Sequence, residues 1–106
     1  MPGVDDRARR EGSGPPVAAI RVRVVVTGRV QGVWFRDTCR DVAKVAGVSG
    51  FVRNRADGTV EAEFEGTAAA VERMIAWCRI GPARARVDGV DVERLEPGGA
   101  PTFRIR

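Results

Sequence analysis

The 106-residue sequence contains no histidine and only one lysine, Lys44. Without histidine it lacks the commonest acid–base residue and the commonest metal ligand, so any chemistry must proceed without both. The 18 basic and 14 acidic side chains leave a net charge of +4, and arginine supplies almost all of the positive charge. This excess favours anionic partners, although an ordinary solvated surface would account for it as well.

Cysteines and long apolar runs are also scarce. Cys39 and Cys78 both fall within helical patterns, and two cysteines are too few for a disulfide framework, so we expect reduced core thiols. No stretch approaches the roughly 18 apolar residues that cross a bilayer, and the first residues lack the apolar centre of a secretory signal. We therefore expect a cytoplasmic protein that makes no membrane contact.

The composition divides the chain into a tail and one domain. Residues 1–17 mix charges with glycine, serine and a Pro-Pro pair and show no periodicity, which predicts a disordered or loosely ordered tail. Residues 18–106 are long enough for one domain, and the sequence is 43% hydrophobic, which suffices for one modest core.

Hydrophobic periodicity predicts seven elements in this domain. Strands are expected at 20–27, 49–54, 59–65, 86–96 and 102–106, and helices at 34–47 and 68–80. A change of phase between Val87 and Val90 predicts a bulge around Asp88 and Gly89. The order βαββαβ plus a short C-terminal strand indicates an α+β, ferredoxin-like sandwich, in which two helices cover one face of an antiparallel sheet.

The stretch "GRVQGVWFR", residues 28–36, joins the first strand to the first helix. Gly28 and Gly32 let the loop curl, so that successive backbone N–H groups and the helix N-terminus can face one anion. Arg36 falls in the first helical turn, and its side chain is expected to lean back over the loop. The residues alone leave two interpretations open: a small-anion site closed by Arg36, or a tight turn with a solvated arginine.

Together with "GFVRNRADGTVE", residues 50–61, this stretch resembles the paired signature of the acylphosphatases. The resemblance extends from about Ile20 to Arg106. It implies an enzyme that hydrolyses the carboxyl–phosphate bond of acyl phosphates to a carboxylate and inorganic phosphate, with no metal, no cofactor and no phosphoenzyme. Phosphate or other small anions are expected to bind as product or inhibitor, and we expect a monomer because nothing in the patterning demands a dimer.

The resemblance assigns roles to particular residues. Arg36 is expected to hold the substrate phosphate, and Asn54 to position the attacking water. The remaining phosphate contacts are expected from the loop amides of Arg29, Val30, Gln31, Gly32 and Val33. Without the resemblance, Asn54 would be interpreted as a turn residue that opens "NRADG".

Three alternative functions compete with this interpretation. "CRIGPAR", residues 78–84, has the spacing of a cysteine-dependent phosphatase loop, but Cys78 falls on an apolar helix face. An RNA-binding module of the same topology would carry aromatic residues on its central strands, where this chain has Glu61, Glu63 and Glu65, so we expect no nucleic acid partner. We expect these glutamates to be solvated cross-strand partners of arginines on the first strand. A domain that binds an anion without turnover would not need Asn54.

Overall fold

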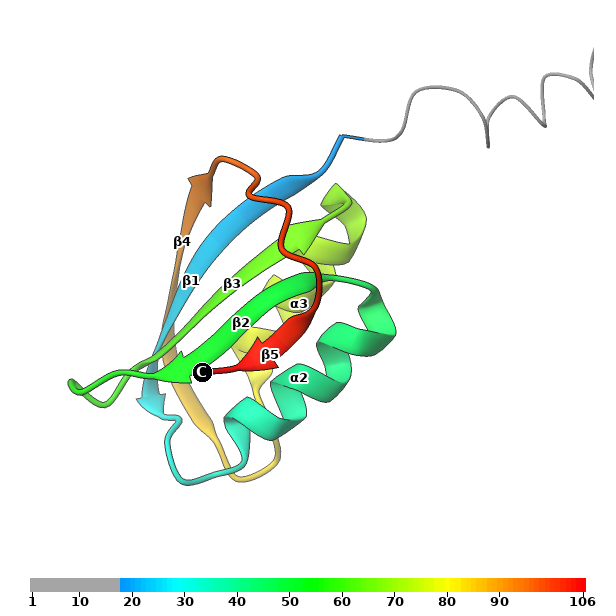
Figure 1. The fold of residues 1–106 in the computed structure, drawn as a ribbon. Helices are drawn as coiled ribbons and strands as arrows, with labels where there is room; N and C mark the ends of the chain where they lie inside the picture. Colours follow the sequence, from blue (N-terminus) through cyan, green and yellow to red (C-terminus); the bar gives the residue numbers. More distant parts are fainter. Residues whose placement is uncertain (1–17) are drawn as a thin grey trace, which may run out of the picture.

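The computed structural model describes residues 18–106, so the predicted tail at 1–17 lies outside the described residues. The elements follow the predicted order (Figure 1). They are β1 (Ile20–Arg29), α2 (Phe35–Ala46), β2 (Ser49–Asn54), β3 (Val60–Gly66), α3 (Ala68–Ile80), β4 (Arg86–Leu95) and β5 (Phe103–Ile105). The ferredoxin-like α+β fold is thus confirmed.

The strands form one sheet in the order β4-β1-β3-β2-β5. The first four strands pair in antiparallel fashion, but β5 pairs with β2 in parallel, with Gly50 opposite Phe103 and Val52 opposite Ile105. After β4 the chain crosses in front of the sheet to its opposite edge, so β5 enters from the end at which β2 begins (Figure 1). The prediction of an antiparallel sheet is therefore correct for every pair except this last one.

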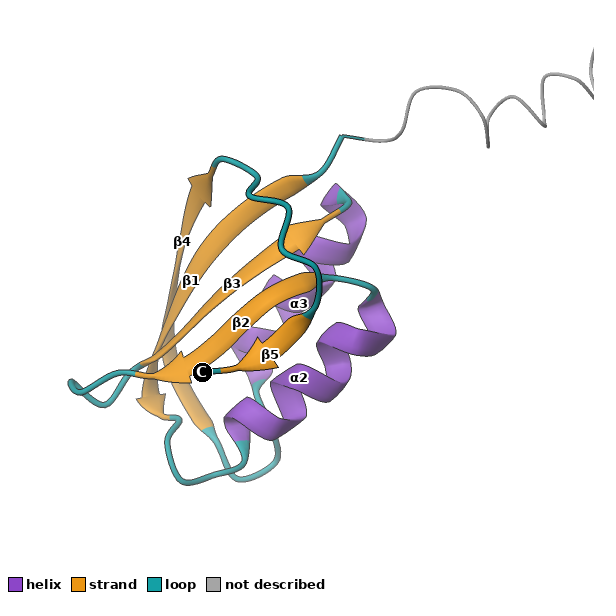
Figure 2. Ribbon diagram, viewed as in Figure 1, coloured by secondary structure: helices purple, strands orange, loops and turns teal. Residues whose placement is uncertain are grey.

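Both helices lie against one face of the sheet (Figure 2). Each helix turns three side chains inward at helical spacing: Phe35, Cys39 and Ala43 from α2, and Val71, Met74 and Cys78 from α3. They pack against the alternating inward residues of the central strands, which are Val22, Val24 and Val26 of β1 and Val60, Ala62 and Phe64 of β3. The core therefore fills the space between the sheet and the two helices.

The two cysteines meet in this core as free thiols. Both side chains are fully buried, and a hydrogen bond with Cys78 together with burial raises the pKa of Cys39 well above its usual range. The prediction of reduced core thiols is confirmed. Because Cys78 faces the interior from α3, the structure gives no support to a cysteine-dependent phosphatase loop at residues 78–84.

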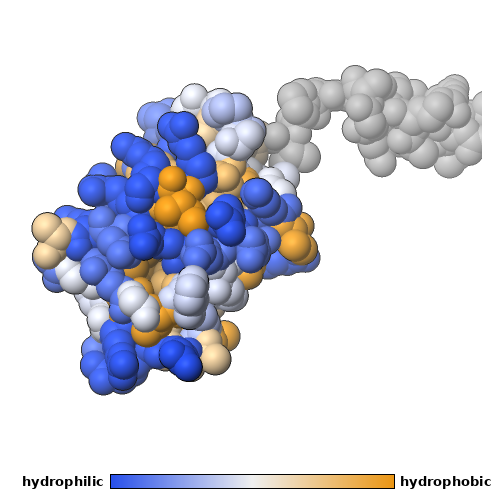
Figure 3. Space-filling view, turned by 60° about the horizontal axis from the view of Figure 1, so that its bottom comes forward, coloured by the Kyte–Doolittle hydropathy of each residue, from blue (hydrophilic) through white to orange (hydrophobic). Residues whose placement is uncertain are grey.

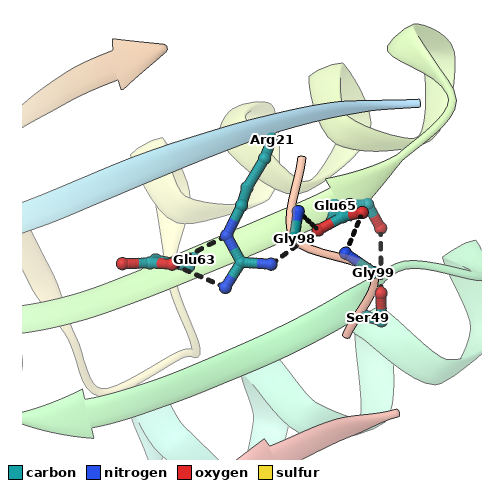
Figure 4. A network of polar contacts seen from close by, with 6 residues as sticks. All are labelled: Arg21, Ser49, Glu63, Glu65, Gly98 and Gly99. Atoms are coloured by element: carbon teal, nitrogen blue, oxygen red, sulfur yellow. Dashed lines mark hydrogen bonds and ion pairs between the residues drawn. The ribbon is translucent and has the colours of Figure 1, made fainter. Parts of the chain in front are cut away.

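The outer face of the sheet carries ion pairs between neighbouring strands (Figure 4). Arg21 on β1 donates to Glu63 at 2.8 Å and to Glu65 at 2.6 Å, as expected for cross-strand partners. Glu61 and Glu65 are only 7% exposed, so the expectation of solvated side chains was wrong for these two. Arg23 pairs with Glu93 of β4, not with the glutamates of β3.

Glu65 also fixes the crossing segment between β4 and β5. The backbone N–H groups of Gly98 and Gly99 donate to its two carboxylate oxygens, each at 2.9 Å (Figure 4). Burial opposes ionisation of this carboxyl, but these two donors and Arg21 outweigh it and lower the pKa of Glu65. A charged Glu65 therefore holds the segment that leads into β5.

The predicted bulge lies where β1 passes β4. Thr27 pairs with Gly89 and Gly28 pairs with Val87, so Asp88 is the extra residue on β4. Gly28 has a φ of 126°, and a Cβ there would lie 2.1 Å from the backbone oxygen of Arg86. Glycine is required at this point because the two backbones approach too closely for any side chain.

Candidate active site

The loop between β1 and α2, residues 30–34, is anchored by two buried valines. Val30 and Val33 pack into the core, whereas Gly32 between them is exposed. Gly32 has a φ of 74°, and a Cβ there would meet no atom within 4 Å. Its need for glycine is therefore conformational, in contrast to the steric need at Gly28, and the loop curls as the spacing of the two glycines predicted.

The N-terminus of α2 begins beside this loop without a side-chain cap. Trp34 is the N-cap residue, with φ 68° and ψ 22°, and its side chain makes no capping hydrogen bond. Within residues 18–106, the backbone N–H groups of Gln31, Gly32 and Val33 donate to no protein acceptor. Free amides and the positive end of a helix dipole together favour an anion at this point.

Arg36 occupies the first turn of α2, as predicted. Its side chain is exposed and forms no ion pair within the part of the chain that the structure describes. Helical side chains lean toward the N-terminus, which is the direction of the loop, and Arg36 lines the same cavity as Gly32 of that loop. A guanidinium stays charged at all working pH values and offers a planar fork for two oxygens of a phosphate.

Asn54 reaches the same end of the sheet from β2. It is the last residue of β2, lies opposite Val60 of β3 and is half-buried. The hairpin that follows is closed by Asp57, which accepts hydrogen bonds from the N–H and the hydroxyl of Thr59 at 3.0 and 2.6 Å. These two donors lower the pKa of Asp57, so the turn is tightest when Asp57 is ionised.

Arg36 and Asn54 line one cavity of about 240 Å³. The two residues are far apart in sequence, and the fold brings them together at the end of the sheet where β1 meets α2 (Figure 1). The wall is completed by Val30, Gly32, Trp34, Phe35 and Asp37. The cavity thus combines a cationic fork, free backbone amides and one neutral amide side chain, which is a set of groups able to bind a phosphate and a water molecule.

Asp37 is the one acidic residue of this wall. Its Oδ1 lies 4.0 Å from a terminal nitrogen of Arg40, one turn further along α2. The helix dipole favours a carboxylate in the first turn, which gives Asp37 a structural role. Its charge nevertheless makes this side of the cavity unfavourable for a second anionic group.

Gln31 has a role that the sequence did not reveal. Its side-chain nitrogen donates to the backbone oxygens of Arg55 and Thr59, at 2.8 and 2.9 Å. These carbonyls lie in the hairpin directly after Asn54, so Gln31 fastens the loop of Arg36 to the segment of Asn54. No pattern in the neighbouring sequence indicates a contact between residues this far apart. The sequence analysis predicted only a phosphate contact from the backbone amide of Gln31.

Four of the seven predicted site residues line the cavity. Those that line the cavity are Val30, Gly32, Arg36 and Asn54. Val33 is buried below the loop, Gln31 points its side chain at the hairpin, and Arg29 ends β1 opposite Arg86. The side chains of Val33 and Gln31 are directed away from the cavity, and the predicted phosphate contacts of this loop are made by backbone amides, which side-chain direction does not affect.

A larger hollow of about 480 Å³ lies on the outer face of the sheet. Arginines and glutamates line it, but Arg21 is engaged by Glu63 and Glu65, and Arg53 by Glu61 at 2.6 Å. Arg104 and Arg106 also line this hollow and form no ion pair among residues 18–106. Among residues 18–106, no three cysteine, aspartate or glutamate side chains gather as a metal site would require, and no helix is long and apolar enough to cross a membrane.

Comparison with known proteins agrees with this geometry. The family model described as acylphosphatase matches residues 22–105. An acylphosphatase of Rubrobacter xylanophilus is 55% identical over 100 residues, which cover 92% of this chain and 90% of the relative. An acylphosphatase of Anaeromyxobacter dehalogenans is 55% identical over 88 residues, which cover 82% and 95%.

A solved structure shares the fold as well as the sequence pattern. The acylphosphatase of Coxiella burnetii superposes with a TM-score of 0.80 at 32% identity, over 83% of this chain and 93% of that chain. The family match, the relatives and this structure all extend over the loop of Arg36 and the hairpin of Asn54. The chain therefore belongs to the acylphosphatase family and is an acylphosphatase.

Proposed function

We propose that Arg36 and the amides of residues 29–33 bind the phosphoryl group of an acyl phosphate, and that Asn54 positions the attacking water. The observation that carries this assignment is the shared cavity of Arg36, Gly32 and Asn54. The free N–H groups of the loop and the fork of Arg36 give the phosphoryl oxygens donors on two sides. The charge that develops on these oxygens in the transition state is met by groups already in place.

The reaction needs no strong acid, because the leaving carboxylate is weakly basic. The water oxygen forms a bond to phosphorus, the bond between phosphorus and the bridging oxygen breaks, and the carboxylate leaves with the bonding electrons. Asn54 accepts a hydrogen bond from the water through its amide oxygen but cannot remove a proton. The proton passes to a phosphoryl oxygen of the substrate itself, which leaves inorganic phosphate as the second product.

Positioning supplies most of the acceleration in this scheme. Arg36 fixes the phosphoryl group, Asn54 fixes the water, and Gln31 fixes the two segments relative to each other. Inorganic phosphate fits the same donors, so it is expected to act as product and inhibitor. We further propose that the protein is a monomeric, cytoplasmic enzyme with no nucleic acid partner.

Hydrolysis of benzoyl phosphate in the presence of a chelator tests this assignment. Arg36→Ala is expected to lose phosphate binding and turnover together, whereas Asn54→Ala keeps phosphate binding and loses turnover. Arg104→Ala is the matched control, because Arg104 is exposed on β5 and lines the hollow on the opposite face. An Asn54→Ala protein with full activity would show that water is positioned by another group, and loss of activity with chelator would contradict a metal-free mechanism.

A further inference from the structure

Trp34 is an exposed aromatic residue in the wall of the proposed site. Its side chain is 69% exposed, although its neighbours Val33 and Phe35 are both buried. It lines the cavity that Arg36 and Asn54 line. The two buried neighbours fix the backbone on either side, so the indole is held outward beside the phosphoryl site.

Protein stability does not explain tryptophan at this position. Trp34 is the only non-glycine residue with a positive φ in the part of the chain that the structure describes, and that conformation is unfavourable for a residue with a Cβ. As N-cap residue it satisfies no helix N–H, a task that serine or asparagine performs. An exposed indole also buries little apolar area. A residue that is unfavourable in these three ways is typical of a functional site.

The substrate supplies a reason for an apolar wall. With the phosphoryl group at Arg36, the acyl group must extend along the rest of the cavity, where Trp34, Phe35 and Val30 present apolar atoms. Asp37 in the same wall repels a negatively charged acyl group. The volume of about 240 Å³ is below the roughly 300–1,000 Å³ of sites for drug-sized ligands, so the acyl group must be small.

The surroundings of the site are otherwise hydrophilic. The view with the lower end of the molecule turned forward shows mostly hydrophilic residues with small apolar areas between them (Figure 3). An acyl group that extends away from the bound phosphoryl group therefore has few apolar surfaces to contact besides the wall of the cavity. The other strongly exposed apolar residues, Val45 and Ile80, do not line the cavity.

We propose that Trp34 binds the acyl group of the substrate, so that the enzyme prefers acyl phosphates with an uncharged aromatic acyl group over acetyl phosphate. An aromatic acyl ring packs against the indole face or edge, whereas a methyl group covers little of it. The inference rests on the proposed function, since it takes the cavity of Arg36 and Asn54 as the phosphoryl site. It adds the substrate class that this site selects.

Steady-state kinetics with two substrates test the proposal. Trp34→Ala is expected to raise KM for benzoyl phosphate by about three- to tenfold, the usual effect of losing one aromatic contact, and to leave KM for acetyl phosphate within about twofold. Trp34→Phe keeps the preference because it keeps an aromatic ring. Val45→Ala, which removes an exposed apolar side chain elsewhere on α2, is the matched control and changes neither value.

A binding measurement does not depend on turnover. In a Trp77→Phe background Trp34 is the only tryptophan, because the sequence contains two, so its fluorescence reports on the site directly. Benzylphosphonate is expected to change this emission and to bind more tightly than methylphosphonate. By calorimetry, Trp34→Ala should bind the two phosphonates with similar affinity.

The outcomes separate this inference from the proposed function. Equal losses on benzoyl and acetyl phosphate in Trp34→Ala would assign Trp34 a structural role and overturn the inference, as would equal affinities of the wild-type protein for the two phosphonates. If the wild-type protein hydrolyses neither substrate, the proposed function fails, and the phosphonate comparison then decides the inference by itself.

Discussion

Replacement of Gln31 by alanine tests whether the site depends on the link between the loop and the hairpin. The substitution removes the hydrogen bonds to the backbone oxygens of Arg55 and Thr59. Neither oxygen is left unpaired, because Arg55 still accepts from the N–H of Gly58 at 3.2 Å and Thr59 from the N–H of Arg55 at 2.9 Å. We therefore expect a loss of about 1–2 kcal/mol in the free energy of unfolding, toward the lower end of the range for two hydrogen bonds.

The magnitude can be checked by thermal unfolding and by kinetics. For a domain of this size, a loss of 1 kcal/mol lowers Tm by about 4–8 °C. Asn54 would no longer be held in register with Arg36, so kcat for benzoyl phosphate should fall by about 10- to 100-fold. The dissociation constant of inorganic phosphate should change by less than about threefold, because Arg36 and the loop amides remain.

Two further variants sharpen the Gln31 experiment. Gln31→Glu should be at least as harmful as Gln31→Ala, because a carboxylate cannot donate to the two carbonyls and also brings negative charge toward the anion site. Ser49→Ala is the matched control: it removes a 3.4 Å hydrogen bond to the backbone oxygen of Glu65, at the far end of the sheet, and should leave kcat unchanged. Wild-type Tm and kcat in Gln31→Ala would refute the positioning role.

Two more predictions concern stability alone. Gly28→Ala should lower the free energy of unfolding by more than about 3 kcal/mol, because the new Cβ would lie 2.1 Å from the backbone oxygen of Arg86. Gly32→Ala should lower it by only about 1–2 kcal/mol, because alanine is unfavourable in the left-handed conformation. Urea denaturation of the two variants compares the losses, and equal losses would contradict the reasoning. Glu65→Gln should cost about 1–2 kcal/mol through weaker hydrogen bonds from Arg21 and the crossing segment. Because the folded protein lowers the pKa of Glu65, its contribution is present above the unfolded pKa and is lost as pH falls through the lower, folded value. The stability gap between wild type and Glu65→Gln should therefore close below about pH 4, the ordinary range of a glutamate pKa, and a gap that persists at pH 2 would argue against this assignment.

The sequence predicted the parts of the fold that depend on local patterns. Hydrophobic periodicity located all seven elements in their observed order. The phase change near Asp88 located the bulge. In each case the determining residues are neighbours in sequence, so the pattern contains the information.

Features that depend on distant residues escaped prediction. The link from Gln31 to the hairpin joins segments separated by a helix and a strand, and nothing beside Gln31 in sequence indicates it. The parallel pairing of β5 depends on where the crossing segment runs, and that segment is held by Glu65 on the distant strand β3. Glutamate normally lies in solvent, so the burial of Glu61 and Glu65 could not be expected from residue type.

The sequence motifs identified Arg36 and Asn54 as candidate site residues but did not reveal the roles of Gln31 and Trp34. Arg36 and Asn54 were identified by two motifs, and the structure brings both to one cavity. Trp34 stands within the first motif, yet its importance became visible only with its exposure and its positive φ. A motif therefore indicated which segments meet, whereas the conformation showed which side chains are available to a ligand.

The pairing of β1 with both β3 and β4 has a consequence for how the protein folds. Arg21 lies opposite Glu65 on one side and Leu95 on the other, so the centre of the sheet closes large loops of chain. Only the hairpin of β2 and β3 joins consecutive strands. Chains dominated by such distant pairings fold slowly, and we expect this hairpin to form first, with β1 inserted later. The half of the candidate site that carries Asn54 would then form before the half that carries Arg36.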